Sequence, residues 1–186
     1  MAKKETTTAA PKGHPQPGYD AQRHGDAHGQ MDLQVTVNGE PQRWRISVKD
    51  MLLEVLRREG YRGAKKGCET GDCGVCAVLV DGQPMASCMM LAAQVQDRSI
   101  TTIEGLGHPD APHPIQAAFA TTGATQCGFC NPGMILSAKA LLDKNPHPSE
   151  DEIRVALDGV LCRCTGYIKQ IEAVQLAAGK KSRRTK

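Results

Sequence analysis

Eight cysteines divide into two groups of four along this 186-residue chain, and no other feature constrains the fold as strongly. The first group has the spacing C-x4-C-x2-C, followed after eleven residues by a fourth cysteine. The second group has C-x2-C, followed after thirty-one residues by C-x-C. Because no cysteine is left over, two four-thiol metal or cluster sites explain the pattern better than isolated buried thiols. The groups are Cys68, Cys73, Cys76 and Cys88, and Cys127, Cys130, Cys162 and Cys164.

The cellular compartment decides whether these thiols would form disulfides. The N-terminus carries Lys3 and Lys4 but no apolar segment after them and no adjacent arginine pair, so we expect neither a secretory nor a twin-arginine signal. No stretch approaches the roughly 18–20 apolar residues that a membrane helix needs, so we expect no membrane association. A cytoplasmic location follows as the default, and thiols there stay reduced. We therefore interpret the cysteines as metal ligands.

The first group has the arrangement of a plant-type ferredoxin, in which a loop supplies three thiolates to a 2Fe–2S cluster and a later residue supplies the fourth. Gly67, Gly71 and Gly74 allow this loop to curl tightly, because glycine tolerates positive φ. They also leave backbone N–H groups free to approach the sulfurs, which tunes the potential of a cluster. Zinc is a weak alternative for this group, because zinc loops favour paired C-x2-C sequences.

The second group is predicted to lie at helix ends, where positive helix N-termini favour thiolates and the negative charge of a cluster. The segment 126–130 leads into a helix that begins at Asn131. The segment 162–164 precedes a helix that begins at about Gly166. Zinc is an open alternative for this group taken alone, since four thiolates also bind zinc tetrahedrally, although C-x-C is tight for one ion.

Residues 31–106 have the pattern of a small sheet. Apolar and polar residues alternate in two early segments, and the dipeptides Asn38-Gly39 and Asp81-Gly82 are hairpin signals. A β-hairpin, a helix and a second β-hairpin in this order suggest a β-grasp domain. The expected elements are strands at 33–37, 44–46, 77–80 and 100–103, a helix at 52–56 capped by Asp50 and ended by Gly60, and a short helix after Cys88.

The rest of the chain is predicted to be helical. The glycine- and proline-rich segment 107–114 is interpreted as a linker. Asn131 as N-cap with Pro132 in the first turn indicates one helix start, and a Ser149–Glu152 capping box indicates another. The sequence thus predicts an α+β chain: a plant-type ferredoxin β-grasp domain over 31–106 and an all-α four-helix domain over 115–179, with helices from about 115, 131, 149 and 166.

The two ends of the chain differ from its body in charge. The formal net charge is +3, but residues 1–30 contribute +1 and the basic tail 180–186 contributes +5, which leaves −3 for residues 31–179. A nucleic-acid binder carries its basic residues on the fold itself, often beside stacking aromatics, so we expect no nucleic-acid partner. We interpret both ends as flexible and solvated, including the extension's histidines, for which metal binding is the weaker interpretation: His14, His24 and His28.

Three motifs in this order resemble the iron–sulfur part of the xanthine oxidase family of molybdenum hydroxylases, and the resemblance covers residues 31–179. The first runs from Gly67-Cys68-Glu69 through Gly71-Asp72-Cys73-Gly74-Val75-Cys76, with Asp81-Gly82 and Ser87-Cys88 after it. The second is Gln126-Cys127-Gly128-Phe129-Cys130 followed by Pro132-Gly133, and the third is Cys162-Arg163-Cys164-Thr165-Gly166-Tyr167. Thr102-Ile103-Glu104-Gly105-Leu106 resembles the segment that closes the first domain.

The resemblance implies an electron-transfer subunit of a heteromeric oxidoreductase, with no catalytic residue of its own. A large partner subunit would hold molybdenum on molybdopterin and hydroxylate the substrate, and a medium subunit would usually hold FAD. Electrons would leave one at a time through the helical-domain 2Fe–2S cluster and then the β-grasp cluster. Gln126 and Cys164 match family positions that approach the pterin, Cys164 also as an iron ligand. Purines, N-heteroaromatics, aldehydes, carbon monoxide and aromatic thioesters are all compatible substrates.

Two other functions fit parts of the pattern. A free two-cluster ferredoxin would also use both cysteine groups, but the body charge of −3 is only weakly acidic for such a carrier. A zinc-dependent interaction module would be colourless, whereas 2Fe–2S proteins are brown. Gly105-Leu106-Gly107 is a lone GxG without the helix of a dinucleotide fingerprint, so no nucleotide is expected on this chain.

Overall fold

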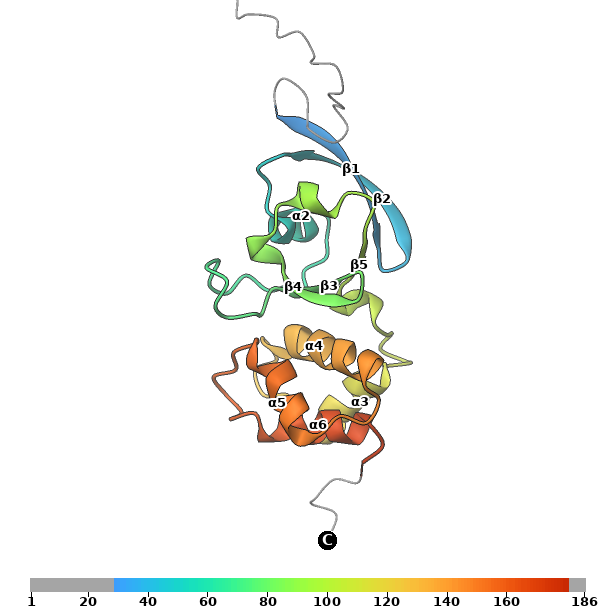
Figure 1. Cartoon of the computed structure of the whole chain (residues 1–186), viewed down its shortest axis with the longest axis vertical. Coiled ribbons are helices and arrows are strands. Elements are labelled where there is room, and N and C mark those ends of the chain that lie inside the picture. The colour runs from blue at the N-terminus through green and yellow to red at the C-terminus, as the bar shows by residue number, and fades with distance from the viewer. Residues whose placement is uncertain (1–28, 181–186) are drawn as a thin grey trace, which may run out of the picture.

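A computed structural model describes residues 29–180 of the chain. The expectations for the N-terminal extension up to residue 28, with its histidines, and for the tail after residue 180 lie outside these residues. Within them, a sheet with one α-helix is followed by a helical part, as Figure 1 shows. The α+β class, with a ferredoxin-like part followed by a helical part, is therefore confirmed.

A mixed five-stranded sheet forms the first part, in the order β2-β1-β5-β3-β4. β1 pairs parallel with β5, and the two hairpins β1–β2 and β3–β4 are antiparallel. Asn38 and Gly39 both have positive φ, as the predicted tight hairpin requires. Asp81 and Gly82 do the same in the second hairpin. The strands are β1 (Gln30–Val37), β2 (Glu40–Ser47), β3 (Ala77–Val80), β4 (Gln83–Ala86) and β5 (Ser99–Thr101).

One helix, α2 (Leu52–Arg58), packs its apolar side chains into a core with the alternating buried residues of β1. Gly60 ends it with φ +99°, as predicted. The predicted cap was wrong: Met51 is the N-cap residue, and the Asp50 carboxylate instead accepts from the Ser47 N–H at 3.1 Å and pairs with Arg58. Asp50 lies one residue too early to reach the free N–H groups of the helix.

The last strand is shorter than predicted. β5 ends at Thr101, and Ile103–Gly105 forms the 3₁₀ turn η3 instead of continuing the strand. The cause is Asn38, whose side-chain oxygen accepts from the Thr102 N–H at 2.8 Å while its Nδ2 donates to the Thr102 hydroxyl at 2.9 Å. These bonds take the place of further ladder bonds. The short helix expected after Cys88 is present as η2 (Ala92–Val95), preceded by η1 (Ser87–Met89).

The helical part contains α3 (Pro114–Thr121), α4 (Asn131–Lys144), α5 (Glu150–Asp158) and α6 (Ile168–Ala177). α4 lies against β3 and β4 and separates the sheet from the other helices (Figure 1). A second hydrophobic core forms there, and it includes Val75 and Leu79 from the sheet side. The two parts therefore pack together across an apolar contact. None of the helices within residues 29–180 is long and apolar enough to cross a bilayer.

The helix starts follow the predictions only in part. The Ser149–Glu152 capping box is confirmed, with the Glu152 N–H donating to Ser149 Oγ at 3.2 Å. Asn131 is not an N-cap: Cys130 holds that position, and Asn131 Nδ2 donates to Thr125 Oγ1 at 2.6 Å. α6 begins two residues later than expected, because both Gly166 and its neighbour have positive φ, which a right-handed helix excludes.

Candidate iron–sulfur sites

The first cysteine group lies on the loop between α2 and β3, with its fourth thiol on η1. Positive φ at Gly71 and Gly74 curls the loop, as the sequence predicts. Gly67 does not have a positive φ, and its missing side chain instead leaves room for the Cys73 sulfur, which would lie 2.7 Å from a Cβ there. The Cys68 sulfur accepts from the backbone N–H groups of Thr70 and Cys73, each at 3.4 Å. The loop therefore already directs backbone donors at a sulfur, as a thiolate cluster ligand requires.

The thiols of this first group form two pairs with different surroundings. Hydrogen bonds from the Thr70 hydroxyl, then from the backbone N–H groups of Thr70 and Cys73, lower the pKa of Cys68 to about 6. Burial, followed by a hydrogen bond with the Cys76 thiol, raises the pKa of Cys88 to about 11. Cys68 thus pairs with Cys73 in a partly exposed position, and Cys76 pairs with Cys88 inside the fold.

The second group joins two connections that are distant in sequence. Cys127 and Cys130 lie between α3 and α4, whereas Cys162 and Cys164 lie between α5 and α6. The sulfurs of Cys127 and Cys164 are 3.6 Å apart at the surface. Burial, followed by a hydrogen bond with Cys162, raises the pKa of Cys130 to about 12. This group also consists of one exposed pair and one more buried pair.

The pairing of the thiols matches what a two-iron centre needs. All eight cysteines are free thiols. A 2Fe–2S cluster has two irons, and each takes two thiolates, so two thiol pairs per group fit it.

The two groups share one cavity of about 260 Å³. Its walls include thiols of both groups, together with apolar side chains between them. The Leu161 N–H donates to the Cys73 carbonyl at 2.9 Å and joins the two loops directly. The cavity is lined by Gly67, Cys68, Cys73, Val75, Cys127, Phe129, Cys130, Leu161, Cys162, Arg163 and Cys164.

Close packing at Gly74 makes this contact possible. A Cβ atom placed on Gly74 would lie only 1.7 Å from the carbonyl oxygen of Gly159, at the end of α5. The Gly74 carbonyl in turn lies 2.9 Å from where a Cβ of Gly133 would be. Each of these carbonyls can come this close only because the residue facing it, Gly74 or Gly133, has no side chain. The glycine therefore serves the contact between the groups as well as the curl of the loop.

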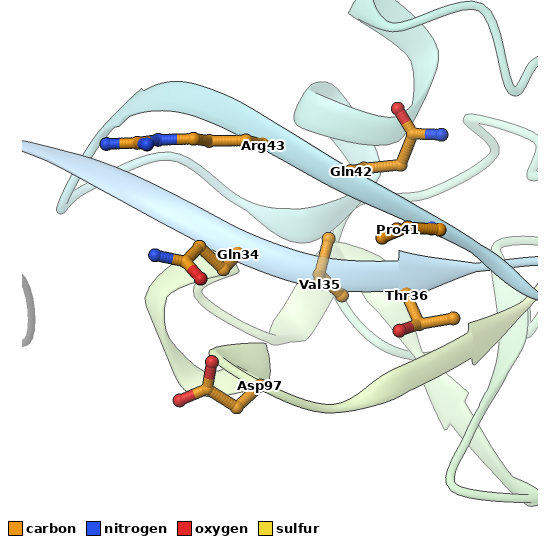
Figure 2. A pocket seen from close by; sticks show the side chains of 7 residues that line it. All are labelled: Gln34, Val35, Thr36, Pro41, Gln42, Arg43 and Asp97. Carbon is orange, nitrogen blue, oxygen red and sulfur yellow. The ribbon is translucent and has the colours of Figure 1, made fainter.

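A larger cavity, of about 440 Å³, has none of the thiols in its wall. Figure 2 shows its side chains coming from β1, from β2 and from the segment before β5. Arg43 and Asp97 are its charged groups. It therefore offers no thiolate for an iron–sulfur cluster. It is lined by Gln34, Val35, Thr36, Pro41, Gln42, Arg43 and Asp97.

The two residues predicted to approach a pterin lie on the surface of the helical part. Gln126 is exposed beside Cys127, and Cys164 is exposed and paired with Cys127. The structure thus brings both predicted positions to the same thiol pair. Their contact with a pterin stays a prediction.

Sequence reasoning missed the polar groups around Cys162. The Cys162 N–H donates to the Tyr167 hydroxyl at 2.9 Å, and that hydroxyl donates to the Val160 carbonyl at 3.1 Å. The Thr165 hydroxyl lies 3.0 Å from the Cys162 sulfur, and Gln170 is buried behind it. A polar residue among the buried apolar positions of α6 is the sequence signal that could have pointed to Gln170.

Comparison with known proteins places this arrangement among iron–sulfur proteins. A family model described as a 2Fe-2S iron-sulfur cluster binding domain matches residues 35–100, and one described as a 2Fe-2S binding domain matches residues 102–175. The small FeS subunit of nicotinate dehydrogenase from Eubacterium barkeri is 46% identical over 148 residues, which cover 79% of this chain and 94% of that protein.

Two solved structures have the same fold. Quinoline 2-oxidoreductase from Pseudomonas putida 86 matches with a TM-score of 0.78 and 42% identity, over 84% of this chain and 98% of that one. The aldehyde oxidoreductase from Desulfovibrio desulfuricans ATCC 27774 matches with a TM-score of 0.77 and 43% identity, over 80% of this chain but only 17% of that one.

The fold and its two thiol groups define a two-site 2Fe–2S protein of the electron-transfer class. Within that class, the chain belongs to the small iron–sulfur subunits of the xanthine oxidase family of molybdenum hydroxylases.

Proposed function

We propose that this chain carries electrons from a molybdopterin site on a large partner subunit, through two 2Fe–2S clusters, to FAD or another acceptor. The observation that carries the proposal is the shared cavity with thiols of both groups in its wall. A relay needs its two centres close together, and this contact joins groups that are far apart in sequence. The clusters, when bound, supply one-electron transfer, and the chain supplies their ligands and surroundings.

The ligands we propose follow the thiol pairs. One cluster would take Cys68 with Cys73 on one iron and Cys76 with Cys88 on the other. The second would take Cys127 with Cys164 on one iron and Cys130 with Cys162 on the other. The free thiols, their pairing and the backbone donors at Cys68 support this assignment.

The exposed edge of the second group supports a direction for the relay, from the second group to the first. The second group presents its Cys127–Cys164 pair and Gln126 at the surface, so we propose that this edge meets the pterin of the partner. Gln126 would form a hydrogen bond to the pterin, and Cys164 would act as an iron ligand beside it. The Leu161 hydrogen bond to Cys73 and the shared cavity hold the second group next to the first, which supports transfer between them.

Large and FAD-binding partners are proposed from the comparisons. One relative is named a small subunit, and this chain corresponds to only 17% of the aldehyde oxidoreductase chain. The chemistry of such enzymes therefore belongs to other subunits or to the rest of a longer chain. A medium FAD-binding subunit is the acceptor that we propose. We also propose a cytoplasmic location, where thiols that bind iron stay reduced.

We also propose that the chain folds as two domains, a plant-type β-grasp domain at about 31–106 and a four-helix domain at about 115–179, joined by 107–114. The two hydrophobic clusters support this division, since one lies beneath the sheet and the other among α3 to α6. Each domain would provide one cluster site.

Iron and acid-labile sulfide per purified chain, with EPR after dithionite reduction, test the function. We expect about four irons, about four sulfides and two distinct rhombic signals. Co-purification of a molybdenum-containing large subunit would separate a bound subunit from a free ferredoxin. Two irons with one zinc would contradict the relay, and protein purified without oxygen that contains no iron would overturn the proposal.

A further inference from the structure

Gln170 on α6 is the one fully buried glutamine within residues 29–180, and its side chain has 0% exposure. It lies among apolar residues, next to Ile171. Its Oε1 atom is buried without a hydrogen-bond partner in this part of the chain. Burying an unpaired carbonyl destabilises a fold, so packing alone does not account for a glutamine here.

The amide nitrogen of Gln170 explains the residue better. Nε2 lies 2.7 Å from Thr165 Oγ1, 3.1 Å from the Ala124 carbonyl and 4.0 Å from the Cys162 sulfur. A backbone carbonyl only accepts, so the atom facing Ala124 must be the nitrogen, which settles the orientation of the amide. Its two hydrogens then go to the two near oxygens.

The Thr165 hydroxyl has one hydrogen and two lone pairs. It accepts from Gln170 Nε2, and the Tyr167 N–H approaches the same oxygen at 3.4 Å. With these donors occupying the acceptor positions, its own hydrogen is left for the Cys162 sulfur, 3.0 Å away. An iron-bound Cys162 has no hydrogen of its own, so the Thr165 hydroxyl is the donor of this pair, and the hydrogen bond from Gln170 keeps its hydrogen directed at the sulfur.

We propose that Gln170 is a positioning residue that sets the reduction potential of the second 2Fe–2S site. By donating to Thr165, it holds that hydroxyl as a donor to the Cys162 sulfur. A donor at a cluster sulfur stabilises the additional negative charge of the reduced state, so it raises the potential. The inference rests on the proposed function, because it needs Cys162 as an iron ligand.

The test is an EPR-monitored redox titration of the intact protein. In Gln170→Met, which keeps the volume but removes the donor, we expect the equilibrium constant for reduction of the second cluster to fall up to about tenfold, about 59 mV for one electron. The first cluster should keep its potential. Thermal stability should change little, because the variant removes the unpaired Oε1 but also leaves the Ala124 carbonyl without its donor. A purely structural role predicts no change in potential.

Thr165 variants decide the same point independently. Thr165→Val removes the hydroxyl at constant volume and should lower the potential at least as much as Gln170→Met. Thr165→Ser keeps the hydroxyl and should restore most of it. The double variant should shift the potential no further than Thr165→Val alone, since both changes break one chain of hydrogen bonds. Gln175→Met, on the same helix but bonded to Glu150, is the matched control and should shift neither cluster.

An unchanged second-cluster potential in Gln170→Met with full iron content would overturn the inference. If that variant loses iron, Thr165→Val decides: a lowered potential supports the inference and an unchanged one overturns it. Failure of the proposed function has a different signature, because the unmodified protein would then lack the second EPR signal.

Discussion

The two thiol groups reach the same paired arrangement by different physical routes. The first group spans 21 residues, from Cys68 to Cys88, and its loop directs backbone N–H groups at a sulfur. The second spans 38 residues, from Cys127 to Cys164, and brings together two connections between helices. Side chains from α6 and from the segment before it surround one of its sulfurs. One loop supplies three of the four thiols of the first site, whereas the second site needs the packed helices.

Exposure also differs between the groups. The first group places one pair inside the fold and leaves the other partly covered. The second group has the pair Cys127 and Cys164 exposed. Because an electron relay needs one centre at the interface with its donor, this difference is the basis of the proposal that the second group meets the partner.

Removing one thiol from each group should have the largest effect. Cys164→Ala should abolish the second EPR signal, halve the iron to about two per chain and stop electron flow from molybdenum. Cys88→Ala should abolish the first signal and leave the second. Iron analysis and EPR of both variants measure the outcome. An intact second signal with normal turnover in Cys164→Ala would show that this thiol is not a ligand.

The contact between the groups is tested by Gly74→Ala. The new methyl group would meet the Gly159 carbonyl, and the residue would keep its φ of +65°. We expect a loss of about 2–4 kcal/mol in the free energy of unfolding, measured by denaturant titration. Gly82→Ala is the matched control, because Gly82 has φ +76° but open space around it, and should cost about 1 kcal/mol. Equal losses would mean that the close approach contributes nothing.

In iron-free protein, the reactivity of the partly exposed Cys68 thiol should differ from that of the buried Cys130 thiol. The pKa of Cys68 is about 6, so its thiolate forms as pH rises through 6 and predominates at pH 7. The pKa of Cys130 is about 12, so this thiol stays protonated. Brief iodoacetamide treatment at pH 7, followed by mass spectrometry of the peptides, should find Cys68 alkylated well before Cys130. The reverse order would refute the assigned hydrogen bonds.

The smallest expected effect concerns the helix that leads to the second group. Ser149→Ala removes the cap of α5 and should lower stability by about 1 kcal/mol. Both EPR signals should persist, because α5 packs on α4 and α6 as well. Thermal unfolding measures the loss of stability. Glu152→Ala removes the other side chain of the capping box and should have a similar effect. If Ser149→Ala lost the first EPR signal, the first thiol group would depend on α5, and the view that each group is held by its own part of the fold would be wrong.

The sequence by itself determined the features that depend on near neighbours. Spacing identified the two groups, the Asn38-Gly39 and Asp81-Gly82 turns followed from dipeptides, and the Ser149–Glu152 box followed from a four-residue pattern. The wrong caps show the limit of such patterns. Asp50 and Asn131 both have side chains that suit a cap, but each is bonded to a different partner that only the folded chain provides.

Tertiary structure alone decided how the thiols pair and how the groups meet. The bond from Leu161 to Cys73 joins residues 88 positions apart, and it exists because glycines let α4 and α5 approach the loop. Gln170 likewise gains its role only through Ala124 and Thr165, which helix packing brings to it. Hydrogen bonds and van der Waals contacts act over a few ångströms, so distant residues interact only after the core has placed them side by side.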